Sequence, residues 1–160
     1  MKAVYAMEPI TGPAIFLAGP TPRSQAVSSW RPAAIQAMSD LGFTDTLLIP
    51  EDRSGKFHGD YLGQIDWETE GLQSAVCIMF WVPRALPDMP AFTTNDEWGF
   101  WKASGKVVFG APNWAEKVRY QQLYCERHGI PSRDSLRDTC AAAIKMFEQL
   151  YEPELSVAWP

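Results

Sequence analysis

Glu97 lies in a segment whose residue types could support nucleophilic chemistry. It ends the run Thr93-Thr94-Asn95-Asp96-Glu97, which follows an apolar strand pattern closing at Phe80-Trp81-Val82. Threonine and asparagine cap helix starts, and the free N–H groups of a first helical turn favour a carboxylate. Acidic residues are common in first turns without any function, but this one would be ionised and placed to act as a nucleophile.

A second acidic group comes from the sequence Asp66-Trp67-Glu68, in a segment with helical spacing. Trp67 could offer an aromatic face to a nucleobase or a sugar. Carboxylates on helix surfaces are usually solvated, and most tryptophans in such positions belong to the core. We therefore treat Asp66, Trp67 and Glu68 as candidates that need a neighbouring site.

The segment Gly19-Pro20-Thr21-Pro22-Arg23 is a third candidate. Glycine lets the backbone approach a ligand closely, and Thr21 and Arg23 supply a hydroxyl and a cation, with Ser24, Ser28 and Ser29 following. Next to a helix start, this combination suits a sugar hydroxyl or a phosphate. The segment lacks the repeated glycines of dinucleotide and Walker loops.

The elements that must position these residues alternate between apolar strands and helical patterns. We expect strands over 14–18, 46–50, 75–82 and 106–109, with a further one near 4–6. Helices are expected over about 28–41, 61–74, 93–104, 114–128 and 133–151. This order predicts one α/β domain over residues 1–160, a flavodoxin-like three-layer sandwich with a mostly parallel sheet of four to five strands.

Ligands of such sheets bind beyond the carboxyl ends of the strands, where the strand order reverses. In a flavodoxin-like order this crevice separates the strand at 14–18 from the strand at 75–82. The segment after Gly19, the residue Arg84 and the helix start with Glu97 should meet there.

Composition limits the partners. With a formal net charge of −5 and no basic run, binding to nucleic acid is not expected, because phosphates require a basic surface. Apolar runs are too short to cross a bilayer and no signal pattern is present, so we expect a cytoplasmic protein with no membrane partner. Three cysteines at wide spacings and two histidines favour reduced thiols and no metal or other cofactor.

Together these segments resemble the nucleoside 2-deoxyribosyltransferase superfamily, in particular its nucleoside 2-deoxyribosyltransferase-like branch. The resemblance covers about residues 14–112. It rests on four segments in order: Ile15-Phe16-Leu17-Ala18-Gly19-Pro20, Trp67-Glu68, Phe80-Trp81-Val82-Pro83-Arg84, and Thr93 to Gly99 followed by Ser104-Gly105-Lys106.

The resemblance implies an enzyme that cleaves or transfers the N-glycosidic bond of a nucleoside or nucleoside 5′-monophosphate. Glu97 would be the nucleophile that forms a glycosyl ester, and Gly99 would let its helix approach closely. Glu68 would orient the sugar or base, with Asp66 as the fallback. A second carboxyl group close to the ionised Glu97 could carry a raised pKa. Relatives of this kind also imply a homo-oligomer.

Two positions depart from the pattern of that superfamily. Ala91 stands where many members have Asp or Ser, and Val76 replaces an Asp. Other groups must then bind or protonate the base, with Asn95, Asp96 and Asp88 as candidates. A non-catalytic nucleotide-sensing module on the same fold, or a structural or interaction protein, are the alternatives.

Overall fold

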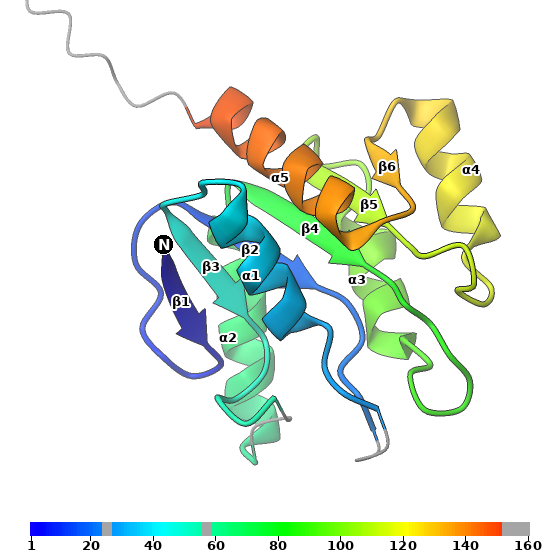
Figure 1. Cartoon of the computed structure of the whole chain (residues 1–160). Coiled ribbons are helices and arrows are strands. Elements are labelled where there is room, and N and C mark those ends of the chain that lie inside the picture. The colour runs from blue at the N-terminus through cyan, green and yellow to red at the C-terminus, as the bar shows by residue number, and fades with distance from the viewer. Residues whose placement is uncertain (24–26, 56–58, 152–160) are drawn as a thin grey trace, which may run out of the picture.

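The computed structural model describes residues 1–23, 27–55 and 59–151 and contains one parallel sheet between two layers of helices (Figure 1). The strands are β1 (Lys2–Tyr5), β2 (Ala14–Ala18), β3 (Thr46–Ile49), β4 (Cys77–Trp81), β5 (Val107–Gly110) and β6 (Ser132–Arg133). The helices are α1 (Arg31–Asp40), α2 (Tyr61–Ser74), α3 (Phe92–Trp101), α4 (Arg119–His128) and α5 (Leu136–Leu150).

The strand order is β1-β3-β2-β4-β5-β6, and every pairing is parallel. From β2 onward this is the flavodoxin-like order. The chain leaves β2 toward β3 on one side and returns to β4 on the other, so the order reverses between β2 and β4. The predicted fold class is confirmed, and the crevice lies between the two strands that the sequence indicated.

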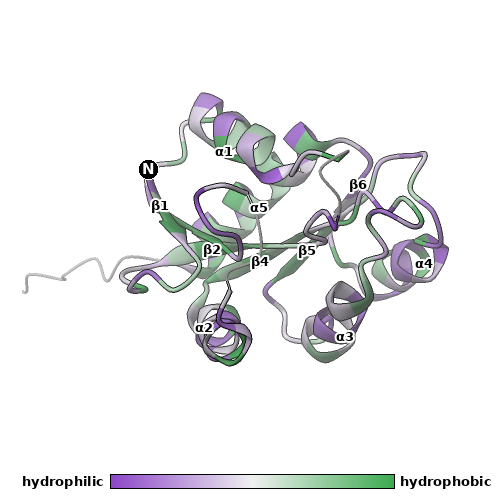
Figure 2. Ribbon diagram, turned by 90° about the horizontal axis from the view of Figure 1, so that it is seen from below, coloured by the Kyte–Doolittle hydropathy of each residue, from purple (hydrophilic) through white to green (hydrophobic). Residues whose placement is uncertain are grey.

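Both faces of the sheet are covered, which explains why β2 and β4 are apolar at every position. Figure 2 shows α1 and α5 on one face and α2 and α3 on the other. The face under α1 and α5 buries Leu17, Met79 and Phe147, and the opposite face buries Phe16, Phe80 and Trp98. These two apolar layers fix the helices that carry the candidate residues.

The sheet has six strands, more than the four to five expected. The additional strand is β6, two residues that pair with β5 and are too short for a periodic pattern. The predicted helix over 114–128 begins only at Arg119, and the one over 93–104 begins at Phe92 and ends at Trp101.

Lys106 fixes the end of α2 against the start of β5. Its Nζ donates 2.8 Å hydrogen bonds to the carbonyls of Leu72, Gln73 and Ala75, which otherwise lack helical partners. Gly71 lets the same helix approach the sheet, because a Cβ there would lie 2.8 Å from Phe16. Both contacts hold α2 in the position from which Glu68 projects.

All three cysteines are buried and unpaired, and burial raises the pKa of each thiol to about 12. This agrees with the expected reduced thiols. None of the helices in the described residues combines the length and apolar character required to span a bilayer.

Candidate active site

A cavity of about 480 Å³ lies at the carboxyl ends of β2 and β3, between α2 and the start of α3. Its walls come from five parts of the chain. The described residues that line it are Gly19, Pro20, Thr21, Pro22, Arg23, Arg31, Pro50, Tyr61, Gln64, Ile65, Glu68, Pro90, Ala91, Phe92, Thr93, Thr94 and Glu97. Glu97 and Glu68 therefore face one cavity, as do Gly19, Pro20, Thr21 and Arg23.

Gly19 allows the ends of β2 and β4 to approach each other at the edge of this cavity. Its φ is +148°, and a Cβ built on it would lie 2.2 Å from the carbonyl oxygen of Trp81 and 2.8 Å from the ring of Trp30. A side chain would collide with backbone that cannot move freely. The glycine is thus required by the packing of the crevice wall.

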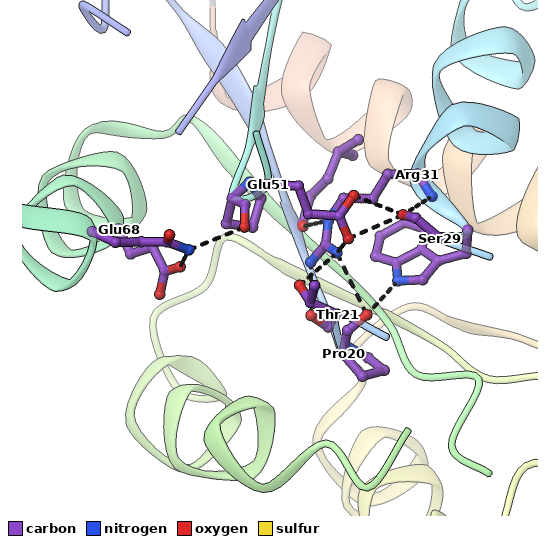
Figure 3. A network of polar contacts seen from close by, with 11 residues as sticks. Pro20, Thr21, Ser29, Arg31, Glu51 and Glu68 are labelled. Atoms are coloured by element: carbon purple, nitrogen blue, oxygen red, sulfur yellow. Dashed lines mark hydrogen bonds and ion pairs between the residues drawn. The ribbon is translucent and has the colours of Figure 1, made fainter. Parts of the chain in front are cut away.

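The buried side chain of Arg31 holds the loop that follows β2 in place. Its Nε donates to the Leu17 carbonyl at 3.1 Å and its Nη2 to the Gly19 carbonyl at 2.7 Å, while Nη1 contacts Pro20 and Thr21. Nη1 also pairs with Glu51, and both side chains are only 1% exposed. Figure 3 shows this network, in which Ser29 donates to Glu51 at 2.7 Å.

Glu97 reaches the cavity from the second turn of α3. The helix begins at Phe92, and its N-cap is Ala91, which adopts a left-handed conformation with φ of 58° and makes no side-chain cap. The expectation that Thr93, Thr94 or Asn95 caps the helix and that Glu97 lies in its first turn is therefore wrong. Because Trp98 packs on Phe80 at a ring distance of 5.4 Å, its neighbour Glu97 is held beside the cavity.

The cavity changes the ionisation of Glu97. Burial and the nearby charges of Glu68 and Asp96, opposed by Arg31, raise the pKa of Glu97 to about 8. Burial also raises the pKa of Glu68, opposed by a hydrogen bond from Gln64 and by Arg31. The expectation that Glu97 is ionised at neutral pH is thus wrong for the unliganded protein, because the side chain is buried, a second carboxyl group is close, and Glu97 lies one turn beyond the N–H groups at the start of α3.

Asp66 and Trp67 are not among the described residues that line the cavity. Trp67 is buried in the core, where its ring lies 6.1 Å from Phe16 and its Nε1 donates to the Glu8 carbonyl at 2.8 Å. Asp66 is exposed on the same helix. Helical geometry explains the difference, since Gln64 and Glu68 are separated by four residues and share the face toward the cavity.

The cavity lining among the described residues also lacks Arg84, Asn95 and Asp96. Arg84 is buried behind α3, where Nη1 donates to the Lys117 carbonyl at 2.8 Å and Nη2 to Asn95. Asn95 accepts a further bond from Gln121 at 3.1 Å, and Asp96 is exposed. The hydrogen bonds of Arg84 to Asn95 and to Lys117 thus connect α3 to the segment before α4.

Gly99 does not bring its helix close to another element, because a Cβ there would meet nothing within 4 Å among the described residues. Val76 directly precedes β4 and packs against the core on the face of the sheet under α1 and α5. Ser24 and His58 lie outside the described residues.

Sequence reasoning missed several residues of the cavity. Gln64 looked like an ordinary polar helix residue, yet it is buried and donates to Glu68. Tyr61, Ile65 and Phe92 form an apolar part of the lining although each is exposed to solvent. Gln64 precedes Glu68 by four residues, Ile65 by three and Tyr61 by seven, so all three share its face of the helix. Phe92 begins the helix of Glu97. These relations were the available signal.

The protein is therefore of the α/β class, with a parallel sheet and two carboxyl groups in one cavity at the carboxyl ends of its strands. Ligands of such folds bind at this edge of the sheet. The family model described as nucleoside 2-deoxyribosyltransferase like matches residues 12–115. The chain belongs to this family. A comparison with curated proteins gives no match.

Proposed function

We propose that this protein cleaves the N-glycosidic bond of a nucleoside or nucleoside 5′-monophosphate through a glycosyl ester on Glu97. The observation that supports this most strongly is the pairing of Glu97 with Glu68 in one cavity of about 480 Å³. Family membership favours a nucleoside as the ligand. The volume suits a small molecule of that size.

In the proposed reaction a carboxylate oxygen of Glu97 attacks C1′ of the sugar. The C1′–N bond breaks, its electron pair stays on the nucleobase, and the base takes up a proton and leaves. Positive charge that develops on the sugar ring is stabilised by the two adjacent carboxyl groups. Water or a second base then attacks C1′ and releases Glu97.

The proton for the leaving base comes, in this proposal, from the carboxyl pair. Ala91 contributes only a methyl group to the lining, Asn95 is bound to Arg84, and neither Asp88 nor Asp96 belongs to the described lining. Glu97 gives up its proton when the substrate binds, and the base receives it. One proton thus moves from the pair to the base, so the base leaves neutral.

The sugar and base would be held by the remaining lining. Tyr61 and Phe92 offer aromatic faces for a base. Arg31 is fully engaged with Glu51 and the loop carbonyls, so a 5′-phosphate would depend on Arg23, whose guanidinium lies 5.7 Å from the centre of the Phe92 ring. The cytoplasmic location and the homo-oligomeric state stay predictions.

The test is base release from a panel of nucleosides and 5′-monophosphates, followed by chromatography. Glu97→Gln should abolish release, because an amide cannot form the ester, whereas Asp96→Asn, the matched change on an exposed neighbour, should retain it. Intact-mass measurement after acid quench should show a sugar adduct in the wild type. Full turnover in Glu97→Gln would refute the mechanism.

A nucleotide-sensing module is the second candidate, and the missing side-chain oxygen at Ala91 favours it. This function predicts that a nucleotide raises the melting temperature without release of base, because a ligand that binds the native state stabilises it.

A further inference from the structure

Gln64 connects the end of β3 to one member of the carboxyl pair. Its side chain is 2% exposed. Nε2 donates one hydrogen bond to the Pro50 carbonyl at 3.2 Å and another to Glu68 Oε1 at 2.7 Å, and the second of these is drawn beside Glu68 in Figure 3. The backbone carbonyl of Pro50 follows β3 directly and therefore orients the amide, so the remaining N–H points at Glu68.

This contact is asymmetric between the two carboxyl groups. An amide N–H can only donate, and a donor stabilises a carboxylate more than a neutral carboxyl group. Within the part of the chain that the structure describes, Glu97 receives no hydrogen bond. Burial acts against the charge of both groups, and among the described residues Glu68 alone receives a hydrogen bond that opposes this effect.

We propose that Gln64 is a positioning residue that keeps Glu68 ionised and thereby leaves the proton of the pair on Glu97 in the unliganded protein. The effect of Gln64 on the ionisation of the pair does not require turnover. Only its role in catalysis rests on the proposed function. The arrangement would store one proton on the nucleophile until a substrate base accepts it. It would also keep the second carboxylate ready to stabilise the charged sugar ring.

The other charged and titratable groups around the pair come from each element packed against it. Arg31 from α1 acts on both carboxyl groups and is itself paired with Glu51. Asp96 on α3 raises the pKa of Glu97 further. Arg23 and Tyr61 line the cavity. Arg31 favours ionisation of both members, so it does not select between them, whereas the Gln64 amide donates to Glu68.

The experiment is a pH titration of the glutamate side-chain carboxyl carbons by NMR, with resonances assigned through Glu68→Gln and Glu97→Gln. In the wild type, Glu68 should ionise at lower pH than Glu97. In Gln64→Leu, the midpoint of Glu97 should fall by about one pH unit or more, because Glu68 then holds the proton. The matched control Gln73→Leu, an exposed residue of the same helix, should leave both midpoints unchanged.

Two results would overturn the inference. One is a wild-type protein in which Glu97 ionises at lower pH than Glu68. This result can be observed even if Gln64→Leu does not fold. The other is a folded Gln64→Leu protein with unchanged midpoints. Because these titrations require no substrate, failure to release base would refute the proposed function and leave this inference standing. Where base is released, the mechanism needs one proton on the pair, so the acidic limb of kcat/KM reports the ionisation of Glu68. It should move to higher pH in Gln64→Leu, because the donor that favours this ionisation is lost.

Discussion

Arg31 and Glu51 form an ion pair from which water is almost fully excluded, with each side chain 1% exposed. They are separated by 20 residues in the sequence and join the start of α1 to the end of β3. The same guanidinium holds the carbonyls of Leu17, Gly19 and Pro20. The loop that forms one wall of the cavity is thus held by the buried guanidinium of Arg31, which takes no part in the proposed reaction.

This pair predicts an unequal effect of single and double substitutions. Arg31→Met should lower the free energy of unfolding by about 3 to 5 kcal/mol, because it leaves the Glu51 carboxylate buried without a partner. Arg31→Met combined with Glu51→Met removes both charges and should recover a large part of that loss. Urea denaturation of the three proteins measures this, and a single variant within about 1 kcal/mol of wild type would contradict it.

Glu97 predicts a pH-dependent stability. Its pKa is about 8 in the folded protein and 4.5 as an ordinary glutamate. Between these values the folded state holds a proton that the unfolded state has released, so the free energy of unfolding falls as pH rises through this window. The loss should be on the order of 2 to 4 kcal/mol.

The matched experiment is the difference in unfolding free energy between Glu97→Gln and wild type, measured from pH 5 to pH 9. Groups that do not interact with Glu97 cancel in this difference. The variant should gain relative stability with rising pH while losing base release. A difference that stays constant over this range would show that Glu97 titrates normally.

Two glycines should respond in opposite directions to alanine. Gly19→Ala places a Cβ 2.2 Å from the Trp81 carbonyl and should cost more than about 2 kcal/mol of stability together with most activity. Gly99→Ala adds a methyl group in open space within a helix and should stabilise the protein by about 0.5 to 1 kcal/mol. Thermal unfolding compares them directly, and a neutral Gly19→Ala would remove the assigned role of that glycine.

Ala91 offers a gain-of-function test of the proton source. Aspartate tolerates the left-handed backbone at this position better than most residues, so Ala91→Asp would place a new acid in the cavity wall. We expect kcat/KM for base release to rise about tenfold or more, within the range of general acid catalysis. Ala91→Asn has the same shape without the acid and should give no gain; equal rates in the two variants would exclude this role.

Arg23 distinguishes a nucleotide substrate from a free nucleoside. If a 5′-phosphate is bound, Arg23→Gln should raise KM for the monophosphate about tenfold or more and leave KM for the nucleoside nearly unchanged, since a lost charged hydrogen bond costs about 1.5 to 3 kcal/mol. Steady-state kinetics on the matched nucleoside and monophosphate pair measures this. A change of equal size for both substrates would assign Arg23 to the shape of the loop.

The sequence by itself determined the parallel sheet, the reversal between β2 and β4, the bounds of α2 and the placement of Gly19, Glu68 and Glu97 near one edge. These features follow from local periodicity, from turn residues and from the short motifs of the family, and each of these signals involves only a few neighbouring residues. It could not place β6, whose two residues are too few for a pattern.

Only the tertiary structure decided which side chains face the cavity and how they ionise. Trp67 and Glu68 are adjacent in sequence, yet one enters the core and the other the cavity. Arg84 bonds to a carbonyl 33 residues away, and Gln64 meets Pro50 and Glu68 only because α2 packs beside β3. The charges that act on Glu97 come from α1, α2 and α3, and its burial depends on how these helices pack, so no local pattern encodes its raised pKa.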